Sequence, residues 1–456
     1  MEDVIVVGAG ISGLATAYFL RQRGWNPLVL EAGPRVGGNL QSYREEGFLR
    51  DTGPNSLLLK GDIVPTWLHE LGLETEQVEA NAVAKRRYIV NQNHQPVAIG
   101  PGILLKGSLL SLSARLRLLS EPLRRPRLSS AEESIASFVR RRLGADVLTW
   151  LVDPFVSGIF AGNPEQLSVQ ASLPRLVRLE QQSGSLLRGA LRARKDAKTP
   201  KSRLISFREG LQTLPLRVSE KLGDAVHCNT PIDHLERQAN GVWEVHSHTQ
   251  RWQSRRVILA LPARAAADLL AATDPTLSQL LEEIPYPAVR VLSLGFQRAD
   301  IRHPLDGFGM LIPRILGLET LGVLFSSTLF PDRAPSDQVL LTVFIGGSQN
   351  HIQGRSDAAL LETVLRELQP LLGICGNPTF IRHQHWPEAI PQYELGHLER
   401  IQHIDALTEK YPGLYFRANW RDGVALGDCM EAAYRLSREE DWSSPQKFNA
   451  GNNAPD

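Results

Sequence analysis

The hydrophobic positions of this chain follow two patterns, and together they predict a mixed helix and sheet protein. Short unbroken runs of apolar residues, such as Val4–Val7 and Pro27–Leu30, are typical of strands buried on both faces of a parallel sheet. Apolar residues spaced three and four positions apart predict amphipathic helices instead. Such helices are expected over residues 14–24, 62–73, 130–144, 211–223, 263–270, 358–371 and 430–437, with another around 150–155.

Further apolar and alternating runs predict a second, antiparallel sheet. Arg87–Val90 and Pro96–Ile99 flank a polar turn and are expected to form a hairpin. The domain that begins the chain is expected to resume around Gly210, where residues 226–232 pair with 241–245 and residues 256–262 form a buried strand. The other predicted strands cover residues 289–296, 309–312, 321–325, 339–345 and 380–383.

Composition sets broad limits on the class of protein. The 456 residues suit two or three folded units, and 42% apolar with 22% charged residues are ordinary globular values. A net charge of +1 gives no reason to expect nucleic-acid binding. The three cysteines are scattered, so neither a disulfide framework nor a metal site is expected. No signal or transit segment and no spanning helix is expected, which favours a cytoplasmic protein, soluble or peripheral.

Basic residues gather in the middle of the chain. Residues 103–127 contain six basic residues against one acidic residue, and residues 175–203 contain nine against two. In the first window leucines alternate with the arginines, a pattern that suits a surface-lying segment on anionic lipid. It suits a helical bundle with solvated arginines equally well. Residues 184–203 are polar and short of large apolar residues, which predicts a loop.

The first strand runs directly into a G-x-G-x-x-G motif, formed by Gly8, Ala9, Gly10, Ile11, Ser12 and Gly13. A helix-period segment follows, and a second strand ends in Glu31. The glycines allow a tight turn, close approach of a pyrophosphate and close helix–strand packing. The helix N-terminus attracts phosphate charge, and Glu31 can accept hydrogen bonds from ribose hydroxyls. This stretch therefore predicts a dinucleotide site.

The residues after Glu31 indicate which dinucleotide is bound. A glycine-rich segment with Arg35, Gly37 and Gly38 resembles the second fingerprint of the amine-oxidase-like flavoproteins, in which the glycines and the arginine lie against the pyrophosphate. A glycine-rich turn between two strands is the alternative. With the first motif, FAD is the expected cofactor. Near the C-terminus, a strand at 413–416, a turn and the last helix could close the same site, with the helix N-terminus toward the flavin pyrimidine.

Several interior stretches resemble oxygen-dependent, FAD-containing protoporphyrinogen oxidases of the bacterial and plastid type. The resemblance covers nearly the whole chain. The stretches that carry it include residues 53–56, 131–135, 153–164, 207–215, 324–327, 330–335 and 423–427. The resemblance implies an α/β (α+β) fold of three parts. These are a Rossmann-like FAD-binding domain (1–75, 208–280 and 395–456), an antiparallel-sheet substrate domain (76–100 and 281–394) and an α-helical membrane-associating insertion (101–207). It also favours the membrane reading of the basic segment.

The resemblance also implies roles for single residues. Leu311 and Leu324 match positions that sandwich a tetrapyrrole ring, and Phe344 matches an aromatic residue that packs on another ring. Arg87, with Arg86 beside it, matches the anchor of a propionate, and Gly162 matches a backbone position at the cavity floor. From the residues alone, Leu311, Leu324 and Phe344 would be ordinary core. The implied cofactor residues are those of the first motif together with Glu31, Ala32, Arg35, Gly38, Asn39, Gly53, Pro54, Asn55, Ser56, Ile232, Trp386, Val424, Ala425 and Leu426.

The implied reaction is oxidation of protoporphyrinogen IX to protoporphyrin IX in haem or chlorophyll biosynthesis. The flavin N5 takes a hydride from a methylene bridge in each of three steps, and dioxygen reoxidises the flavin to give hydrogen peroxide. No side chain is expected to act as an acid–base catalyst. The implied location is the inner or thylakoid membrane surface. A homodimer and hand-over of product to a chelatase are left open.

One departure and three rival functions remain. Arg417-Ala418 stands where the family usually has a small residue and glycine; if position 418 needs a positive φ, alanine would cost about 1 kcal/mol or more, with weaker FAD binding. Arg417 either adds a cation near the flavin or points outward. The rivals are oxidation of coproporphyrinogen III, oxidation of an amine or carotenoid, and a non-catalytic flavin or porphyrin carrier.

Overall fold

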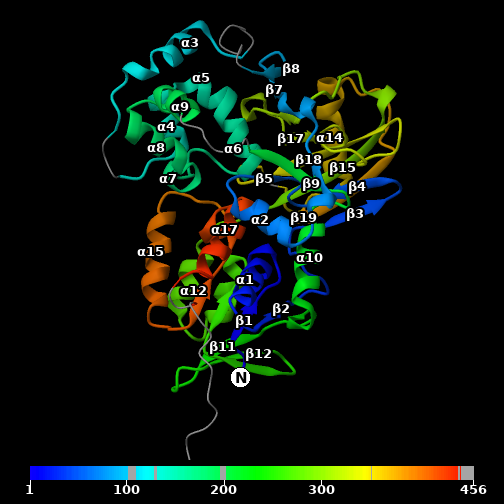
Figure 1. Ribbon diagram of the computed structural model, residues 1–456. Coiled ribbons are helices and arrows are strands. Elements are labelled where there is room, and N and C mark those ends of the chain that lie inside the picture. The colour runs from blue at the N-terminus through cyan, green and yellow to red at the C-terminus, as the bar shows by residue number, and fades with distance from the viewer. Residues whose placement is uncertain (101–108, 128–130, 196–201, 351, 440–441, 443–456) are drawn as a thin grey trace, which may run out of the picture.

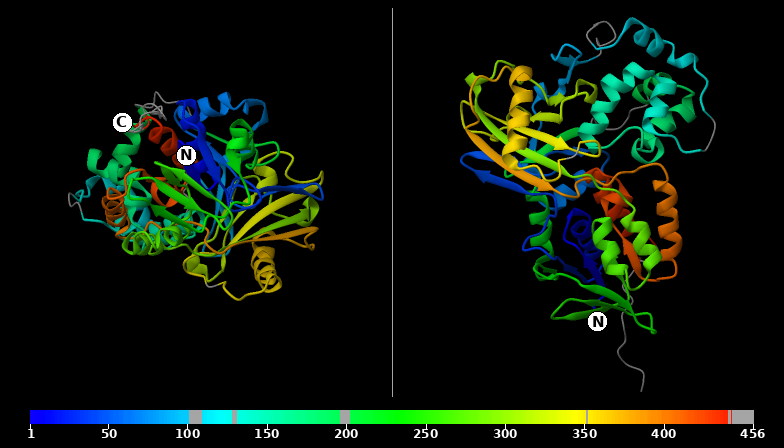
Figure 2. Two further views of the ribbon diagram at one scale, coloured as in Figure 1. Left: turned by 90° about the horizontal axis from the view of Figure 1, so that it is seen from below. Right: turned by 180° about the vertical axis from the view of Figure 1, so that it is seen from behind.

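The computed structural model describes residues 1–100, 109–127, 131–195, 202–350, 352–439 and 442 (Figure 1). Three regions are visible. A parallel sheet with its helices forms the lower part of Figure 1, and a seven-stranded sheet and a group of helices lie above it. Seen from behind, these two upper regions lie side by side (Figure 2). The mixed helix and sheet class predicted from the sequence is confirmed.

The parallel sheet has the strand order β10-β2-β1-β14-β20. Its strands are Val226–His227, Pro27–Leu30, Val4–Val7, Val257–Leu259 and Leu414–Phe416, and all four pairings are parallel. Val4 and Val6 face a core formed with helices α1 (Ile11–Gln22), α2 (Ile63–Glu70), α10 (Thr213–Leu222) and α17 (Leu426–Leu436). Ile5 and Val7 face the opposite core, formed with α11 (Ala263–Leu270), α12 (Pro275–Glu282) and α15 (His397–Thr408). The sheet is therefore covered on both faces, as its continuous apolar strands predict.

One predicted strand pairing is wrong. The strand that begins at Val226 does not pair with residues 241–245; it is two residues long and extends the parallel sheet beside β2. The partners of β12 (Trp243–His246) are β11 (His234–Arg237) and β13 (Arg251–Ser254), which form a separate antiparallel sheet. Pro231 lies between β10 and β11; because it has no N–H, it suits a break between the two strands.

The seven-stranded sheet has the order β19-β15-β18-β17-β16-β7-β8. The predicted hairpin is present as β7 (Arg87–Val90) and β8 (Pro96–Ile99). The pairings are antiparallel, except that β7 runs parallel to β16. Helix α14 (Asp357–Leu372) packs on one face and closes a core there. The remaining strands are β15 (Val289–Gln297), β16 (Gly309–Leu311), β17 (Thr320–Phe325), β18 (Gln338–Gly346) and β19 (Phe380–Trp386).

The third region consists of helices from the middle of the chain. They are α3 (Leu112–Leu119), α4 (Ile135–Arg142), α5 (Ala145–Val147), α6 (Asp153–Phe160), α7 (Val169–Ser172), α8 (Pro174–Ser183) and α9 (Leu186–Lys195). The predicted loop at 184–203 is wrong, because α9 occupies much of it. Helix α4 begins later than predicted, since Ser134 is its N-cap and accepts a hydrogen bond from the Ser137 N–H. Part of the basic segment, residues 103–108, lies outside the described residues.

Strand β9 (Arg203–Phe207) leads the chain back to the parallel-sheet region. It pairs with β5 (Leu57–Leu59) and β6 (Gln77–Glu79) in a small antiparallel sheet. The remaining elements are β3 (Ser42–Glu45), β4 (Phe48–Asp51), α13 (Ser326–Leu329) and α16 (Asn419–Asp422). Among the described residues, no helix has both the length and the apolar character needed to cross a membrane.

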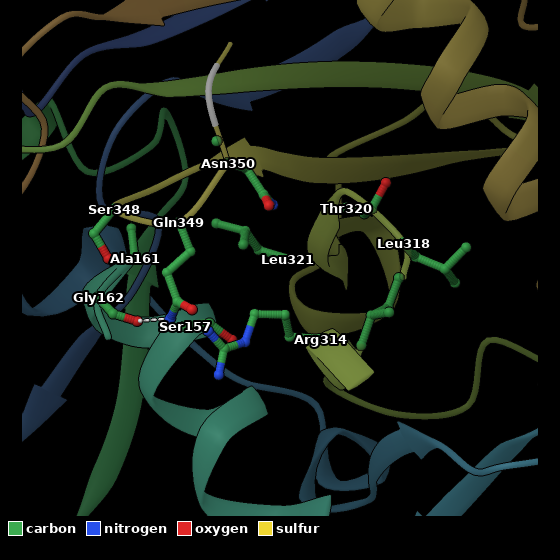
Figure 3. A pocket seen from close by; sticks show the side chains of 12 residues that line it. Ser157, Ala161, Gly162, Arg314, Leu318, Thr320, Leu321, Ser348, Gln349 and Asn350 are labelled. Carbon is green, nitrogen blue, oxygen red and sulfur yellow. Dashed lines mark hydrogen bonds between the residues drawn. The ribbon is translucent and has the colours of Figure 1, made fainter. Parts of the chain in front are cut away.

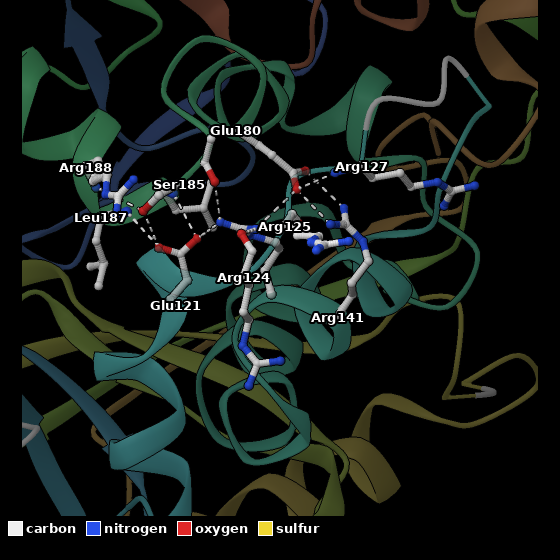
Figure 4. Close-up of polar contacts among 12 residues, drawn as sticks. Glu121, Arg124, Arg125, Arg127, Arg141, Glu180, Ser185, Leu187 and Arg188 are labelled. Atoms are coloured by element: carbon white, nitrogen blue, oxygen red, sulfur yellow. Dashed lines mark hydrogen bonds and ion pairs between the residues drawn. The ribbon is translucent and has the colours of Figure 1, made fainter.

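A buried ionic cluster joins the helices of the third region (Figure 4). Arg142 and Glu121 form an ion pair, and neither side chain has any exposed area. Arg142 also donates hydrogen bonds to the carbonyl oxygens of Arg124 and Gly184. Glu121 accepts hydrogen bonds from Ser185 Oγ and from the N–H groups of Leu186 and Leu187 at the start of α9. The cluster therefore ties α9 to α4 and to the segment after α3.

Candidate active site

The turn between β1 and α1 forms an open cradle at a helix N-terminus. Gly8 has φ of 101°, and a Cβ at Gly13 would collide with the carbonyl oxygen of Gly8. Gly10 is the N-cap of α1, and no side chain caps the helix there. A Cβ at Gly10 would meet no atom within 4 Å. Open space in front of an uncapped N-terminus suits an anionic group such as a pyrophosphate.

Glu31 is fixed by the backbone at the end of β2. Its carboxylate accepts hydrogen bonds from the Ala9 N–H at 2.7 Å and from the Gly33 N–H at 2.9 Å. Each carboxylate oxygen keeps a free lone pair, so Glu31 can still accept hydroxyl groups. Thr230 donates its N–H to the Glu31 carbonyl oxygen at 2.8 Å. Ile232, two residues further on, packs against the core formed with α11 and α12, and Ala32 is exposed at the surface.

The second glycine segment lies directly against the first. Gly37 donates its N–H to the Ala9 carbonyl oxygen at 2.8 Å, and a Cβ at Gly38 would lie 3.5 Å from the Gly10 Cα. A Cβ at Gly53 would collide with the carbonyl oxygen of Asn39, the residue after Gly38, so the segment of residues 53–56 begins beside the second glycine segment. Arg35 is held over the ring of Tyr43, with 5.1 Å from its Cζ to the ring centroid.

The C-terminal segment completes this group of residues. The N-terminus of α17 packs beside α1, where burial raises the pKa of Cys429 to about 12 while a hydrogen bond from Ser12 opposes the shift. Its N-cap, Ala425, gives no side-chain cap, and a Cβ at Gly427 would lie 3.7 Å from the Leu58 carbonyl oxygen. The structure therefore brings Val424, Ala425 and Leu426 together with the two glycine segments.

The expected strain at Ala418 is absent. Ala418 has φ of −156° and ψ of 161°, an extended conformation that any residue adopts. Arg417 forms an ion pair with Asp422 at 3.1 Å and lies 3.7 Å from Glu439. Its charge is thus balanced by this chain's own carboxylates, and the departure at 417–418 gives no reason to expect weak cofactor binding.

One face of the seven-stranded sheet carries four of the five predicted substrate residues. Alternation along the strands places Leu311, Leu324 and Phe344 on the face opposite α14. Gly322 stands between Leu311 and Phe344 in one cross-strand row, and Gly309 stands opposite Leu324 in the next. A Cβ at Gly322 or Gly309 would meet a backbone carbonyl oxygen of the neighbouring strand, at 2.9 Å and 2.2 Å, so neither position can carry a side chain, and the face is apolar around Leu311, Leu324 and Phe344.

The structure distinguishes Arg87 from Arg86. Arg86 forms an ion pair with Asp306, next to the Tyr88 hydroxyl, on the side of the sheet that faces the α14 core. Arg87 belongs to the same cross-strand row as Gly309 and Leu324, and its guanidinium lies 5.0 Å from the centroid of the Phe308 ring. Arg87 is exposed at the edge of the apolar face, where an acidic substrate group can reach it.

Trp386 connects the apolar face with the glycine segments. Its indole N–H donates a 2.7 Å hydrogen bond to the carbonyl oxygen of Thr52, the residue before Gly53. The same ring packs in a cluster with Phe344 and Ala161. The sheet face and the cradle are therefore neighbours. Gly162 follows Ala161 at the end of α6, and its carbonyl oxygen accepts a hydrogen bond from Gln349 at 3.4 Å.

A pocket beside Gly162 contains residues that the sequence did not indicate. Arg314, Gln349 and Asn350 line it, together with Gly162 itself (Figure 3). They lie on loops that flank strands β17 and β18 and belong to no recognisable motif. Without the fold, nothing in the sequence connects position 314 with position 162.

The parallel sheet, the uncapped helix N-terminus and the bordering apolar face define an FAD-dependent oxidoreductase. The chain belongs to the family of flavin-containing amine oxidoreductases, whose model matches residues 11–439. FAD is therefore the cofactor. Protoporphyrinogen oxidase 2 of Arabidopsis thaliana is 35% identical over 98% of this chain and 96% of that protein. Coproporphyrinogen III oxidase of Bacillus subtilis is 28% identical over 94% and 96%. A crystal structure from Exiguobacterium sp. 255-15 superimposes with a TM-score of 0.82 at 26% identity, covering 96% of this chain and 98% of that one.

Proposed function

We propose that this protein oxidises protoporphyrinogen IX to protoporphyrin IX. The observation that carries the proposal is the apolar face of Leu311, Leu324 and Phe344, which borders the FAD cradle through Trp386 and has Arg87 at its edge. A flat macrocycle with acidic side groups matches such a face, because its rings pack on apolar side chains while a carboxylate meets a guanidinium. The names of the curated relatives support the same substrate class.

The residues of this chain would bind and orient both partners. The α1 N-terminus would hold the FAD pyrophosphate, Glu31 the ribose hydroxyls, and the α17 N-terminus the flavin ring. Bound FAD supplies the acceptor for a hydride from a methylene bridge of the macrocycle, and dioxygen then takes the two electrons as hydrogen peroxide. Each step also releases one proton; over three steps, with tautomerisation of the macrocycle, four methylene-bridge hydrogens and two pyrrole N–H hydrogens are removed in total, which gives the aromatic product. The sheet face holds the ring against the flavin and excludes water.

Anaerobic mixing of the holoenzyme with protoporphyrinogen IX tests this function. We expect the visible flavin absorption to bleach and to return when oxygen is admitted, with hydrogen peroxide formed. Lack of bleaching would contradict the proposal and favour a non-catalytic carrier. Bleaching with coproporphyrinogen III alone would indicate that the protein oxidises coproporphyrinogen III instead. Bleaching with an amine or a carotenoid precursor alone would indicate a different activity within the family.

We also propose that the helical region rests on an anionic membrane surface. Leu112, Leu116 and Leu119 on α3 and Leu123 after it are between 59% and 82% exposed, and they follow a helical spacing. Leu191 on α9 is 62% exposed. Arginines lie between the leucines, so the surface combines apolar contact with positive charge.

Substituting Leu116→Asp and Leu119→Asp together should abolish this contact. A leucine side chain transferred from water to an apolar environment contributes about 1.5–3 kcal/mol, so the double variant should bind anionic vesicles at least about tenfold more weakly. Co-sedimentation with vesicles at low and high salt measures the effect. Leu398→Asp, an exposed leucine on α15 in the parallel-sheet region, is the matched control. Equal binding by both variants would show that α3 does not form the contact.

A further inference from the structure

The pocket beside Gly162 continues the apolar face beyond its last row. Leu311, Gly322 and Phe344 form that row, and beyond it Ala161 and Leu321, which cluster with Phe344, also line the pocket. A small hollow of about 20 Å³ lies between the end of α6, the loop after β16 and the loop after β18 (Figure 3). A group projecting from a ring packed on Phe344 would enter this space.

The lining of the pocket combines apolar side chains, among them Leu318 and Leu321, with the positively charged Arg314. The Arg314 guanidinium lies near Ser157 and the Gln349 amide in Figure 3. Among the described residues it has one ionic partner, Asp153, which it meets through a single terminal nitrogen at 3.2 Å. Burial raises the pKa of Asp153, and the charge of Arg314 opposes that shift. The other N–H groups of Arg314 are free to form a planar fork toward a carboxylate.

Asn350 is a further polar residue of the pocket lining. Asn350 donates its amide N–H to the Glu319 carbonyl oxygen at 3.0 Å.

Arg314 and Arg87 stand at opposite corners of the apolar face. Arg87 is on β7, in the row of Leu324, whereas the pocket lies at the far ends of β17 and β18. From β7 to β18 the sheet crosses three strand spacings of about 4.8 Å each, and the pocket is also two rows further along the strands. One carboxylate cannot contact both arginines.

We propose that Arg314 and its pocket form a second carboxylate subsite, which takes a propionate from the part of the macrocycle remote from Arg87. This inference rests on the proposed porphyrinogen site. Protoporphyrinogen IX carries its two propionates on neighbouring rings, so it fills one corner. Coproporphyrinogen III carries a propionate on every ring, so it fills both. The subsite therefore gives this chain a means of binding the four-propionate macrocycle.

Fluorescence titration of the FAD-loaded protein with coproporphyrin III and with protoporphyrin IX tests the subsite without turnover. Arg314→Gln should raise the Kd for coproporphyrin III by about tenfold, the loss expected for one charge-assisted carboxylate contact. It should raise the Kd for protoporphyrin IX several times less. Arg87→Gln should weaken both ligands. Asp153→Asn keeps the guanidinium and should leave coproporphyrin III binding within about twofold, since it removes only the internal partner of Arg314.

Each outcome decides the proposal. Equal weakening of both ligands by Arg314→Gln, an unchanged Kd for coproporphyrin III, or the same defect in Asp153→Asn would overturn it, because a structural ion pair produces that result. Failure of the wild-type protein to bind either porphyrin would overturn it as well. If discrimination is found but neither porphyrinogen bleaches the flavin, the subsite stands and the proposed oxidation fails. FAD content and melting temperature show that each variant is folded.

Discussion

Gly10→Val should give a folded protein that no longer retains FAD. The N-cap Gly10 has φ of −68° and ψ of 174°, values that valine adopts, and a Cβ there would meet no atom within 4 Å. The fold itself therefore tolerates the substitution. The same open space lies before the α1 N-terminus, where the pyrophosphate would approach the backbone, so two methyl groups would displace it. We expect FAD affinity to fall by at least about a hundredfold, about 2.7 kcal/mol.

Titration of the apoprotein with FAD, followed by flavin fluorescence, measures this loss. Gly100→Val is the matched control, because a Cβ at Gly100 also meets nothing within 4 Å but Gly100 follows β8 in the other sheet. Gly13→Ala should instead destabilise the fold itself, because the alanine Cβ would collide with the Gly8 carbonyl oxygen. A Gly10→Val protein with ordinary FAD content would show that the cofactor is held elsewhere.

Glu121→Gln should loosen the whole helical region. Glu121 is fully buried and faces Arg142, which is also fully buried. Removal of the Glu121 charge leaves the buried Arg142 guanidinium with the Glu180 carboxylate, 3.6 Å away, as an ionic partner, so we expect a cost at the lower end of the range for a broken buried pair, about 3 kcal/mol. Burial disfavours the charged form of Glu121, but hydrogen bonds from Ser185, Leu186, Leu187 and Arg142 hold its pKa below the usual value. Its stabilising contribution is therefore complete above a pH of about 4.3 and is lost as the pH falls through the lowered pKa.

Hydrogen exchange of the α9 amides measures this effect locally, since a chain of several folded regions does not unfold in one step. Glu165→Gln is the control. Glu165 pairs with Arg140, which lies on α4 as Arg142 does, but the side chains of Glu165 and Arg140 are both about half exposed. A solvent-exposed pair contributes at most about 1 kcal/mol. Replacing both Glu121 and Arg142 by leucine should restore part of the protection. Equal effects of Glu121→Gln and Glu165→Gln would contradict the assigned importance of the buried cluster.

Local pattern was sufficient for the elements whose burial is uniform. Val4–Val7 and Val257–Leu259 are apolar at every position, so they could be assigned to a buried sheet without knowledge of their partners. The cofactor cradle was equally accessible, because glycine spacing and the acid at position 31 are properties of a short segment. The apolar face was not, since Leu311, Leu324 and Phe344 resemble core residues until the sheet register places them on one side.

Features that depend on distant residues escaped prediction. Helix α9 appears polar and loop-like in sequence, yet Glu121, more than sixty residues earlier, binds its first N–H groups. The partner of β12 was misassigned because β11, which begins with His234 and has alternate polar positions, carries little hydrophobic signal. The conformation of Ala418 could not be inferred from a family pattern of small residues, because the backbone there is extended.

The order of strands in the parallel sheet has a consequence for synthesis of the protein on the ribosome. Strand β14 ends at Leu259, but its outer neighbour β20 begins only at Leu414. At about 5–20 residues per second, the ribosome needs roughly 8–30 s to supply that neighbour. During this interval the backbone N–H and C=O groups on the outer edge of the apolar strand Val257–Leu259 have no pairing partner. Unpaired strand edges of this kind promote aggregation. Nascent chains stalled between these two strands should therefore be the species that chaperones bind most strongly.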